Sequence, residues 1–295
     1  MLLCLIWGSS WIVIQDGLST LPPLLSAGLR FVIAGLVMAG VAAGLREREG
    51  GQAPPTWLWL LLATTNFALC YGIVYIVQQT LPSGLVSVLW AVYPLMMAGC
   101  GHLLLPEERL RGLQWFGFLV GFVGIVLLFD TDLATLASGR KAALLLFLSP
   151  LCAAFGTTML KRHGANSSSL ILNRNAMALG GVLLLAGSVL AGEPLSLDID
   201  RRAVFGLVYL SVFGTVVTLG LYYWILRYVP ANRLSLIAYV TPAIALFLGW
   251  AIAAEPIRVT TVIGTILILG GIAIATGLSF FAKTTNAERP ATHPE

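Results

Sequence analysis

Ten apolar segments follow one another along the chain, and only a few polar residues interrupt each of them. Each is about as long as the roughly 20 residues that a helix needs to cross a bilayer, where backbone groups must be satisfied within the helix. Short connections hold most of the charges and many of the prolines. The pattern therefore predicts ten transmembrane helices, over residues 2–18, 23–44, 57–79, 82–104, 112–130, 141–160, 169–191, 203–226, 230–253 and 258–281.

The composition also indicates a protein that lies in lipid. Of 295 residues, 58% are hydrophobic and only 10% are charged, and the mean hydropathy is +0.91. A soluble globule of this composition would expose a very large apolar surface. We therefore expect an all-α integral membrane protein in a lipid bilayer, with connections between helices too short to form a soluble domain.

Two stretches share a skeleton: PSGLVSVLWAVYP begins at Pro82 and PANRLSLIAYVTP begins at Pro230. The offset of 148 positions also pairs Gly72 with Gly220, Tyr75 with Tyr223, Pro94 with Pro242 and Glu107 with Glu255. The ten spans thus form two units of five, residues 1–130 and 141–281, followed by a cytoplasmic tail at 282–295. Because five is odd, the second unit enters the membrane from the opposite side, which predicts two inverted five-helix repeats.

The positive charges predict the orientation. With the N-terminus on the cytoplasmic side, ten lysines and arginines lie in cytoplasmic loops and five lie on the other side. This satisfies the positive-inside rule, so we expect a multi-pass protein of the cell (inner) membrane with both termini in the cytoplasm. The charges are divided among loops and form no single patch, so we expect no nucleic-acid partner.

Polar and aromatic residues at helical spacing mark the faces that could line a water-filled cavity. In the third span Thr64, Tyr71, Tyr75 and Gln78 fall on one face of an ideal helix, and the fourth and eighth spans carry similar stripes. The alternative is ordinary packing or interfacial anchoring. The candidate substrate-binding residues are Trp7, Ser10, Arg30, Tyr71, Tyr75, Trp90, Tyr93, Tyr223 and Tyr239.

Two prolines, Pro94 and Pro242, fall in the middle of predicted spans. Proline there removes an N–H and opens the hydrogen-bond ladder, so each is either a hinge or a fixed bend. Glycines at positions 117, 121, 124, 264, 270 and 271 form small-residue stripes, which predict tight contact between helices or a homodimer surface.

Charged residues are rare at membrane depth. Arg30 and Arg174 are the only ones well within predicted spans, and each either attracts an anionic group or extends to the membrane surface. Glu107 and Glu255 precede the fifth and tenth spans, where a carboxylate suits the positive end of the helix dipole. Apart from Asp16, no acidic residue lies in a span, so facilitated diffusion is favoured over proton antiport by a carboxylate.

Cys4, Cys70, Cys100 and Cys152 all lie in predicted spans, without the close pairing of a zinc or redox centre. We expect no metal and no cofactor. An integral membrane enzyme is disfavoured because no catalytic constellation is visible at membrane depth, so no catalytic residues are predicted. A receptor is disfavoured because the connections are short. An inverted repeat instead suits a carrier that opens to either side by alternating access.

Three features together resemble the EamA family of the drug/metabolite transporter superfamily. They are LLCLIWGSSWIVIQDGL, LPPLLSAGLRF with its Arg30, and the twice-repeated pattern of Pro, Ser, Pro, Glu and Gly. Gln15 stands where members often carry a lysine. The resemblance implies a ten-helix inner-membrane carrier, with a central cavity, that exports amino acids or other small metabolites. The alternative within transport is efflux of hydrophobic cations or drugs, which aromatic faces could bind.

Overall fold

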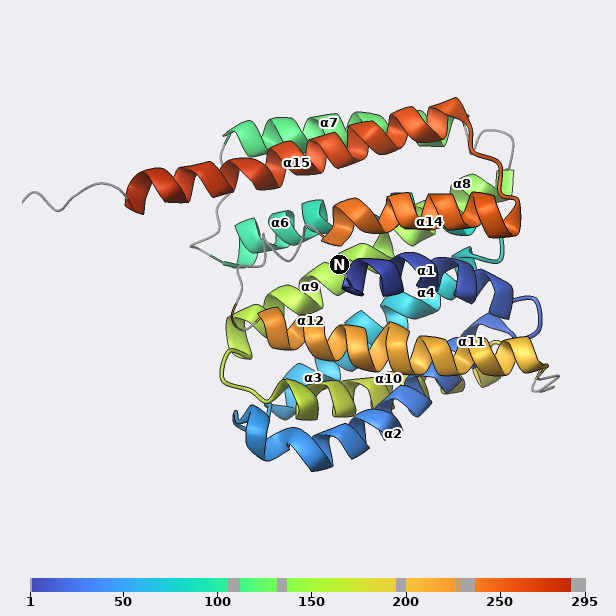
Figure 1. The fold of residues 1–295 in the computed structure, drawn as a ribbon, viewed down its shortest axis with the longest axis vertical. Coiled ribbons are helices and arrows are strands. Elements are labelled where there is room, and N and C mark those ends of the chain that lie inside the picture. Colours follow the sequence, from blue (N-terminus) through green and yellow to red (C-terminus); the bar gives the residue numbers. More distant parts are fainter. Residues whose placement is uncertain are drawn as a thin grey trace, which may run out of the picture.

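The computed structural model describes residues 2–105, 112–131, 137–194, 200–226, 228 and 237–287. Its described helices run roughly side by side, as Figure 1 shows. The pair formed by α7 (Gly112–Thr131) and α15 (Val259–Ala287) lies along one edge of the bundle, and the pair formed by α2 (Pro23–Glu49) and α10 (Ser169–Leu190) lies along the opposite edge. The remaining helices fill the space between these two pairs, and the N-terminus lies in this middle layer.

The helices follow the predicted spans closely. In the first half they are α1 (Leu2–Gly17), α2 (Pro23–Glu49), α3 (Thr56–Leu62), η1 (Ala63–Leu69), α4 (Cys70–Val77), α5 (Ser83–Trp90), α6 (Tyr93–Leu104) and α7 (Gly112–Thr131). In the second half they are α8 (Ala137–Leu146), α9 (Leu148–His163), α10 (Ser169–Leu190), α11 (Arg201–Ser211), η3 (Val212–Val217), α12 (Thr218–Leu226), α14 (Ile237–Ala253) and α15 (Val259–Ala287).

Within the described residues, six helical segments are long and apolar enough to cross a membrane. They are Pro23–Leu45, Thr56–Val77, Ser83–Leu104, Gly139–His163, Ser169–Leu190 and Arg201–Ile225. Shorter apolar helices include Leu2–Gly17, Thr241–Ala253 and Val259–Gly271. An all-helical chain with this many apolar segments is an integral membrane protein, because only helices and closed barrels satisfy their backbone groups in lipid.

Prolines and glycines set several helix boundaries. Pro82 stands at the N-cap of α5 with a ψ of 147°, and Pro23 begins α2, where proline's missing N–H is not needed. Gly50 and Gly192 follow the ends of α2 and α10 with φ values of 69° and 70°. This left-handed conformation suits glycine and ends a helix.

Two of the long segments contain a π-helical stretch. The third predicted span is divided into α3, η1 and α4, and the eighth is divided into α11, η3 and α12. The stretches η1 and η3 begin 149 positions apart, close to the offset of the sequence repeat. In a π-helix the backbone hydrogen bonds join residues five apart in place of four. Side chains after the stretch therefore lie on a different face from the one that α-helical spacing predicts.

This shift makes one prediction wrong. Thr64 was expected to share a face with Tyr71, but Thr64 is exposed and donates to the carbonyl of Leu60 at 3.0 Å. Tyr71 lies in the first turn of α4, after η1, and lines the interior cavity. The α-helical periodicity does not hold across the π-helical stretch.

The prediction for Pro94 also needs correction. The fourth span is not one helix with a central proline, because α5 ends at Trp90 and α6 begins at Tyr93, which leaves Pro94 in the first turn of α6. Pro94 has no N–H for the carbonyl of Trp90, which explains the break. Pro242, in contrast, does lie inside α14 as predicted.

Glycines allow two helix pairs to pack at close range. A Cβ on Gly35 of α2 would lie 2.9 Å from the Cα of Ala178 in α10. A Cβ on Gly124 of α7 would lie 2.7 Å from the carbonyl of Gly264, and one on Gly271 would collide with the Gly121 backbone. The glycine stripes of α7 and α15 are therefore used within one chain, as the packing alternative predicted.

Glutamates near helix ends cap the first turns of other helices. Glu193 follows α10 and accepts hydrogen bonds from the backbone N–H groups of Leu24 and Leu25 in α2, at 3.0 and 2.9 Å. Glu49 ends α2 and accepts from the backbone N–H of Ser169 in α10 at 2.8 Å. A glutamate at the C-terminal end of each helix of this antiparallel pair thus caps the N-terminus of the other. The negative carboxylate is stabilising there because it lies at the positive end of the helix dipole.

Glu49 lies outside the apolar segment, and its environment keeps it charged. Burial raises the pKa of Glu49, but hydrogen bonds from the hydroxyls of Ser168 and Ser169 and from the backbone of Ser169 and Leu170 outweigh that effect. The pKa therefore lies below its ordinary value. The cap is then fully ionised at neutral pH.

Glu255 has a different partner from the one predicted. It was expected to interact with the helix that follows it, but its carboxylate accepts from the N–H and hydroxyl of Ser83 at 2.8 and 2.7 Å and from the N–H of Gly84 at 3.0 Å. It therefore caps α5, in the other half of the chain. Glu107 lies outside the described residues.

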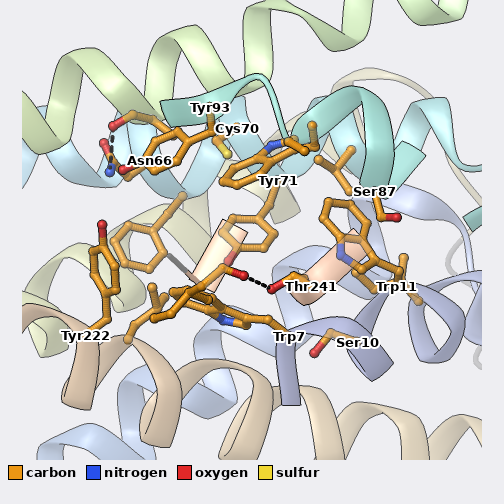
Figure 2. A pocket seen from close by; sticks show the side chains of 18 of the residues that line it. Trp7, Ser10, Trp11, Asn66, Cys70, Tyr71, Ser87, Tyr93, Tyr222 and Thr241 are labelled. Atoms are coloured by element: carbon orange, nitrogen blue, oxygen red, sulfur yellow. Dashed lines mark hydrogen bonds between the residues drawn. The ribbon is translucent and has the colours of Figure 1, made fainter. Parts of the chain in front are cut away.

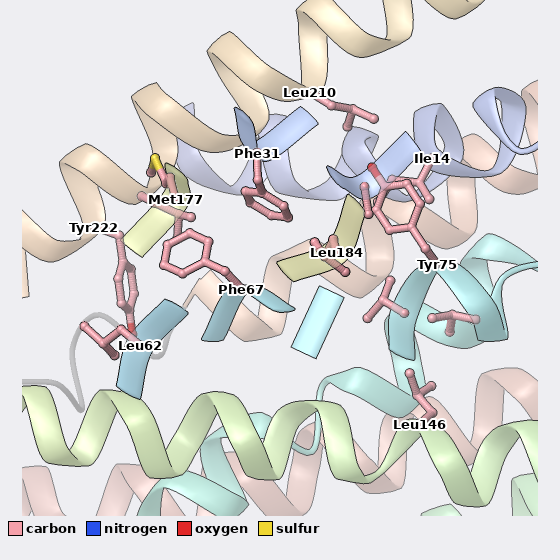
Figure 3. Packing of buried hydrophobic residues seen from close by; sticks show 14 of the residues in the cluster. Ile14, Phe31, Leu62, Phe67, Tyr75, Leu146, Met177, Leu184, Leu210 and Tyr222 are labelled. Carbon is pink, nitrogen blue, oxygen red and sulfur yellow. The ribbon is translucent and has the colours of Figure 1, made fainter. Parts of the chain in front are cut away.

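The apolar core lies between the helix pairs. Figure 3 shows side chains from several helices meeting there, and the T-shaped contact of Phe31 with Phe67 has ring centroids 5.3 Å apart. Met177 and Leu184 of α10 and Leu62 of α3 belong to the same buried cluster. Lipid tails are as apolar as these side chains, so close van der Waals packing stabilises this core more than water exclusion does.

Candidate functional site

A cavity of about 140 Å³ lies between helices of both halves. Figure 2 shows Trp7 and Trp11 of α1, Tyr93 of α6 and Tyr222 of α12 facing a common space. The lining residues are Trp7, Ser10, Trp11, Ile14, Arg30, Asn66, Phe67, Cys70, Tyr71, Val74, Ser87, Trp90, Ala91, Tyr93, Ala153, Thr157, Leu219, Tyr222, Tyr223, Ile237, Thr241 and Pro242. These residues are apolar and aromatic with a few polar groups, which is typical of small-molecule sites.

Seven of the nine candidate substrate-binding residues line this cavity. They are Trp7, Ser10, Arg30, Tyr71, Trp90, Tyr93 and Tyr223. Tyr75 is fully buried beside the cavity and contacts Arg30 instead of the open space. The side chain of Tyr239 lies outside the described residues. Of the two candidate hinges, Pro242 lines the cavity and Pro94 does not.

Aromatic rings form most of the cavity wall. Trp90 and Tyr93 stack with an interplanar angle of 17° and centroids 4.9 Å apart, and Trp11 lies against Trp90 at 6.1 Å. Trp7 packs on Tyr222 with centroids 5.4 Å apart. Such pairs hold one another in place, so the wall keeps its shape and offers ring faces and edges to a ligand.

Arg30 brings a positive charge to this wall. Its side chain is 1% exposed. It donates from Nε to the hydroxyl of Thr215 at 2.9 Å, from one terminal nitrogen to the carbonyl of Gly214 at 3.1 Å and from the other to the hydroxyl of Tyr75 at 3.3 Å. Thr215 and Gly214 belong to η3, so the π-helical stretch supplies two of the three acceptors.

Two rings further stabilise the guanidinium. Its central carbon lies 4.9 Å from the ring centroid of Tyr71 and 5.1 Å from that of Phe31. Each cation–π contact contributes roughly 0.5–2 kcal/mol, whereas burying an ion costs several kcal/mol. No aspartate or glutamate is among the described residues that line the cavity. Arg30 is therefore a buried cation whose partners among the described residues are neutral.

The second arginine lies in a different environment. Arg174 is partly exposed on α10, and its Nε donates to Asn175 at 3.0 Å. It does not line the cavity. Arg30 and Arg174 lie 144 positions apart, as do the capping residues Glu49 and Glu193. The two arginines thus occupy matching places in the two halves, and only Arg30 lies at the cavity.

Sequence reasoning missed Asn66, a polar residue of the wall. Its Nδ2 donates to the hydroxyl of Thr157 at 3.0 Å and lies 3.3 Å from both the hydroxyl of Tyr223 and the carbonyl of Ala153. Asn66 lies in η1, so a face counted with α-helical spacing places it away from Tyr71. Its amide in an apolar span was the available signal.

Trp7 and Trp90 differ in how their indole N–H groups are used. The Nε1 of Trp90 donates to the hydroxyl of Ser149 at 3.0 Å, and this hydroxyl donates to the carbonyl of Cys70 at 2.9 Å. The Nε1 of Trp7 is buried and has no hydrogen-bond partner. Trp90 is therefore held by the protein, whereas Trp7 keeps a free donor at the cavity.

The chain is similar to known membrane transporters along almost its full length. The model of the EamA-like transporter family matches residues 1–130 and 140–277. The "Uncharacterized inner membrane transporter YedA" of Escherichia coli (strain K12) is 28% identical over 86% of this chain and 81% of its own length. The "S-adenosylmethionine/S-adenosylhomocysteine transporter" of Chlamydia trachomatis (serovar L2) is 26% identical over 85% of this chain and 79% of its own.

The fold is also that of a protein already solved by crystallography. That structure matches with a TM-score of 0.70 and 20% sequence identity, and the match covers 96% of each chain. The family match covers more than half of the chain and is accompanied by relatives that are transporters. The chain therefore belongs to the EamA-like transporter family of membrane transporters.

Proposed function

We propose that this transporter is a secondary carrier or facilitator that exports a small metabolite bearing a carboxylate, with amino acids and related compounds as the substrate class. The substrate binds in the cavity between the two halves, against Trp7, Ser10, Arg30, Tyr71, Trp90, Tyr93 and Tyr223. Tyr75 acts from beside the cavity by holding Arg30. Tyr239 stays a candidate because its side chain lies outside the described residues.

The observation that carries this proposal is the buried Arg30 at the wall of the cavity. A buried cation without a counter-ion is costly, and a carboxylate ligand would offset that cost with charge-assisted hydrogen bonds. Arginine presents its donors in a planar fork that matches a carboxylate. The name of the Chlamydia relative supports the substrate class as well, because both compounds in it are amino-acid derivatives.

We further propose ten spans arranged as two inverted five-helix repeats, over residues 1–130 and 141–281, with alternating access as the mechanism. The two family matches support this division. The matching positions of η1 and η3, and the reciprocal caps of Glu49 and Glu193, support a two-fold relation between the halves. A site between related halves can be exposed to either side by rocking one half against the other.

The proposed location is the cell's inner membrane, with both termini in the cytoplasm. The excess of basic residues in one set of loops supports this orientation, and a relative is named as an inner membrane transporter. Among the described residues that line the cavity, none is acidic or a histidine. Facilitated diffusion therefore has more support than coupling to protons through a side chain of the cavity.

Efflux of hydrophobic cations is the alternative. The aromatic wall favours it, because ring faces bind cations. Arg30 opposes it, because a second cation in the same water-poor space would meet a like charge without an acidic partner. The charge of Arg30 therefore favours anionic groups over cations.

Uptake into proteoliposomes tests the proposal. The panel contains labelled amino acids, related carboxylates without the amino group and quaternary ammonium compounds, each measured with and without an imposed pH gradient. We expect saturable flux of a carboxylate-bearing compound that does not respond to the gradient, that is lost in Arg30→Gln and that persists in the matched control Arg174→Gln. Gradient-driven cation flux, without flux of any carboxylate, would contradict the proposal.

A further inference from the structure

The number of N–H donors that Arg30 leaves unused limits which chemical groups a substrate can place beside it. A guanidinium has five N–H donors, and Arg30 uses three of them on Thr215, Gly214 and Tyr75. Two donors are not used in these three bonds, and the hydroxyl of Tyr71 is a further partner of this side chain, which lines the cavity and is 1% exposed. Arg30 therefore keeps a donor that none of these partners uses.

Other polar groups of the described wall differ in what they leave free. The Nε1 of Trp7 is a buried donor without a partner. The hydroxyl of Ser10 donates to the carbonyl of Ile6 at 2.7 Å, and the Oδ1 of Asn66 accepts from Thr65 at 2.9 Å. The described wall thus carries a positive charge and no carboxylate that could receive a cation.

The size and walls of the cavity favour one ring. An apolar cavity of about 150 Å³ can hold a benzene molecule, and this cavity measures about 140 Å³. The stacked Trp90 and Tyr93 lie on one wall, and the tilted pair of Trp7 and Tyr222 belongs to other helices. Offset-stacked and edge-on contacts with such rings favour an aromatic group over an aliphatic group of equal size.

We propose that the substrate is an aromatic monocarboxylate that carries no cationic group, with the carboxylate on the free donor of Arg30 and the ring against the aromatic wall. This inference rests on the proposed function, a carrier of carboxylate-bearing metabolites, and selects from its substrate class the related compounds that lack an ammonium group. An amino acid would bring an ammonium group on the carbon next to the carboxylate, and therefore close to the guanidinium. Within the described wall that ammonium would be desolvated without an anionic partner.

A series of three matched ligands tests the inference on the whole chain in lipid nanodiscs. Phenylacetate has the ring and the carboxylate, phenylalanine adds an ammonium group, and phenethylamine has the ring and the ammonium alone. Calorimetry measures the dissociation constant of each at a pH where phenylacetate is ionised. Propionate, which lacks the ring, tests the contribution of the aromatic wall.

We expect phenylacetate to bind about tenfold or more tightly than phenylalanine, because the ammonium group of phenylalanine meets the like charge of Arg30. Propionate should be weaker by about the same factor because it lacks the ring contacts. Phenethylamine, which has the ammonium group and no carboxylate, should not bind. Arg30→Gln should lose phenylacetate binding, Arg30→Lys should keep part of it, and Arg174→Gln should keep all of it. If Arg30→Gln does not fold, the ligand series on the unmodified chain still decides.

The outcomes separate this inference from the function on which it rests. The inference would be overturned if phenylalanine bound as tightly as phenylacetate, or if propionate did. Either result would leave the proposed carboxylate carrier standing. Failure of every carboxylate to bind or to be transported would overturn both. Binding of phenethylamine alone would overturn both as well and would favour the efflux of cations.

Discussion

The cap that Glu193 places on α2 is a measurable contribution to stability, and its removal gives the sharpest prediction. The carboxylate accepts from the N–H of Leu24 at 3.0 Å, from the N–H of Leu25 at 2.9 Å and from the hydroxyl of Ser188 at 2.8 Å. In Glu193→Ala all three donors lose their partner. The first turn of α2 then has two N–H groups that no residue of its own helix can satisfy.

The expected size follows from these contacts. Loss of a helix cap costs about 0.5–2 kcal/mol, and a buried donor left without a partner costs about 1–3 kcal/mol. These bonds are only partly buried, so water can replace some of them. We expect Glu193→Ala to lower the free energy of unfolding by about 1–2 kcal/mol, which corresponds to a Tm lower by about 2–6 °C.

The assay is thermal unfolding of the purified chain in nanodiscs, followed by tryptophan fluorescence. Glu193→Gln keeps one carbonyl oxygen as an acceptor and should lose less than Glu193→Ala. Asp16→Asn is the control, because Asp16 is an exposed acid at the end of α1. If Glu193→Ala unfolds at the same temperature as Asp16→Asn, the cap does not stabilise the α2–α10 pair and the reasoning is refuted.

Three further predictions concern pH, packing and movement. The lowered pKa of Glu49 means that its cap stabilises the fold above the ordinary carboxyl pKa of about 4.3 and is lost as the pH falls through the lower folded value. Tm should therefore fall on acidification below about pH 5, and Glu49→Gln should flatten that fall; an equal slope in both proteins would contradict it. Gly156→Ala should reduce flux because the new Cβ would collide with Oδ1 of Asn66. Gly99→Ala is the control, because a Cβ there has no neighbouring atom within 4 Å and flux should not change. Equal flux in the two variants would show that Asn66 is not needed for transport. Pro242→Ala restores an N–H inside α14 and should lower flux without lowering Tm if the proline is a hinge, while unchanged flux would indicate a fixed bend.

The sequence determined the membrane helices and much of the cavity wall. In lipid a chain must satisfy its backbone within helices, so apolar length alone located the six described segments that are long enough to cross a membrane. The periodicity of aromatic residues along these helices indicated Tyr71, Trp90, Tyr93 and Tyr223, and the structure places all four at one cavity. Arg30 could be singled out because a charge within an apolar span is costly and therefore informative.

The periodicity failed where the helices depart from α-helical geometry. Thr64 was predicted on the cavity face and Asn66 was missed because η1 shifts the face by one residue, and the local sequence gives no signal of a π-helical stretch. Pro94 was expected inside one helix, and the structure instead places it in the first turn of α6, after a break that its missing N–H explains. Local propensity is a weak guide when neighbouring helices decide which backbone groups are satisfied.

Only the tertiary structure could decide which distant groups meet. The sequence favoured Arg30 over Arg174 as a candidate but could not place either beside a cavity, and the structure places only Arg30 there. It could not show that Glu255 caps α5, because the two are distant in the chain. Spacing along one helix fixes the face on which a residue lies, whereas the partner on that face depends on how the helices pack.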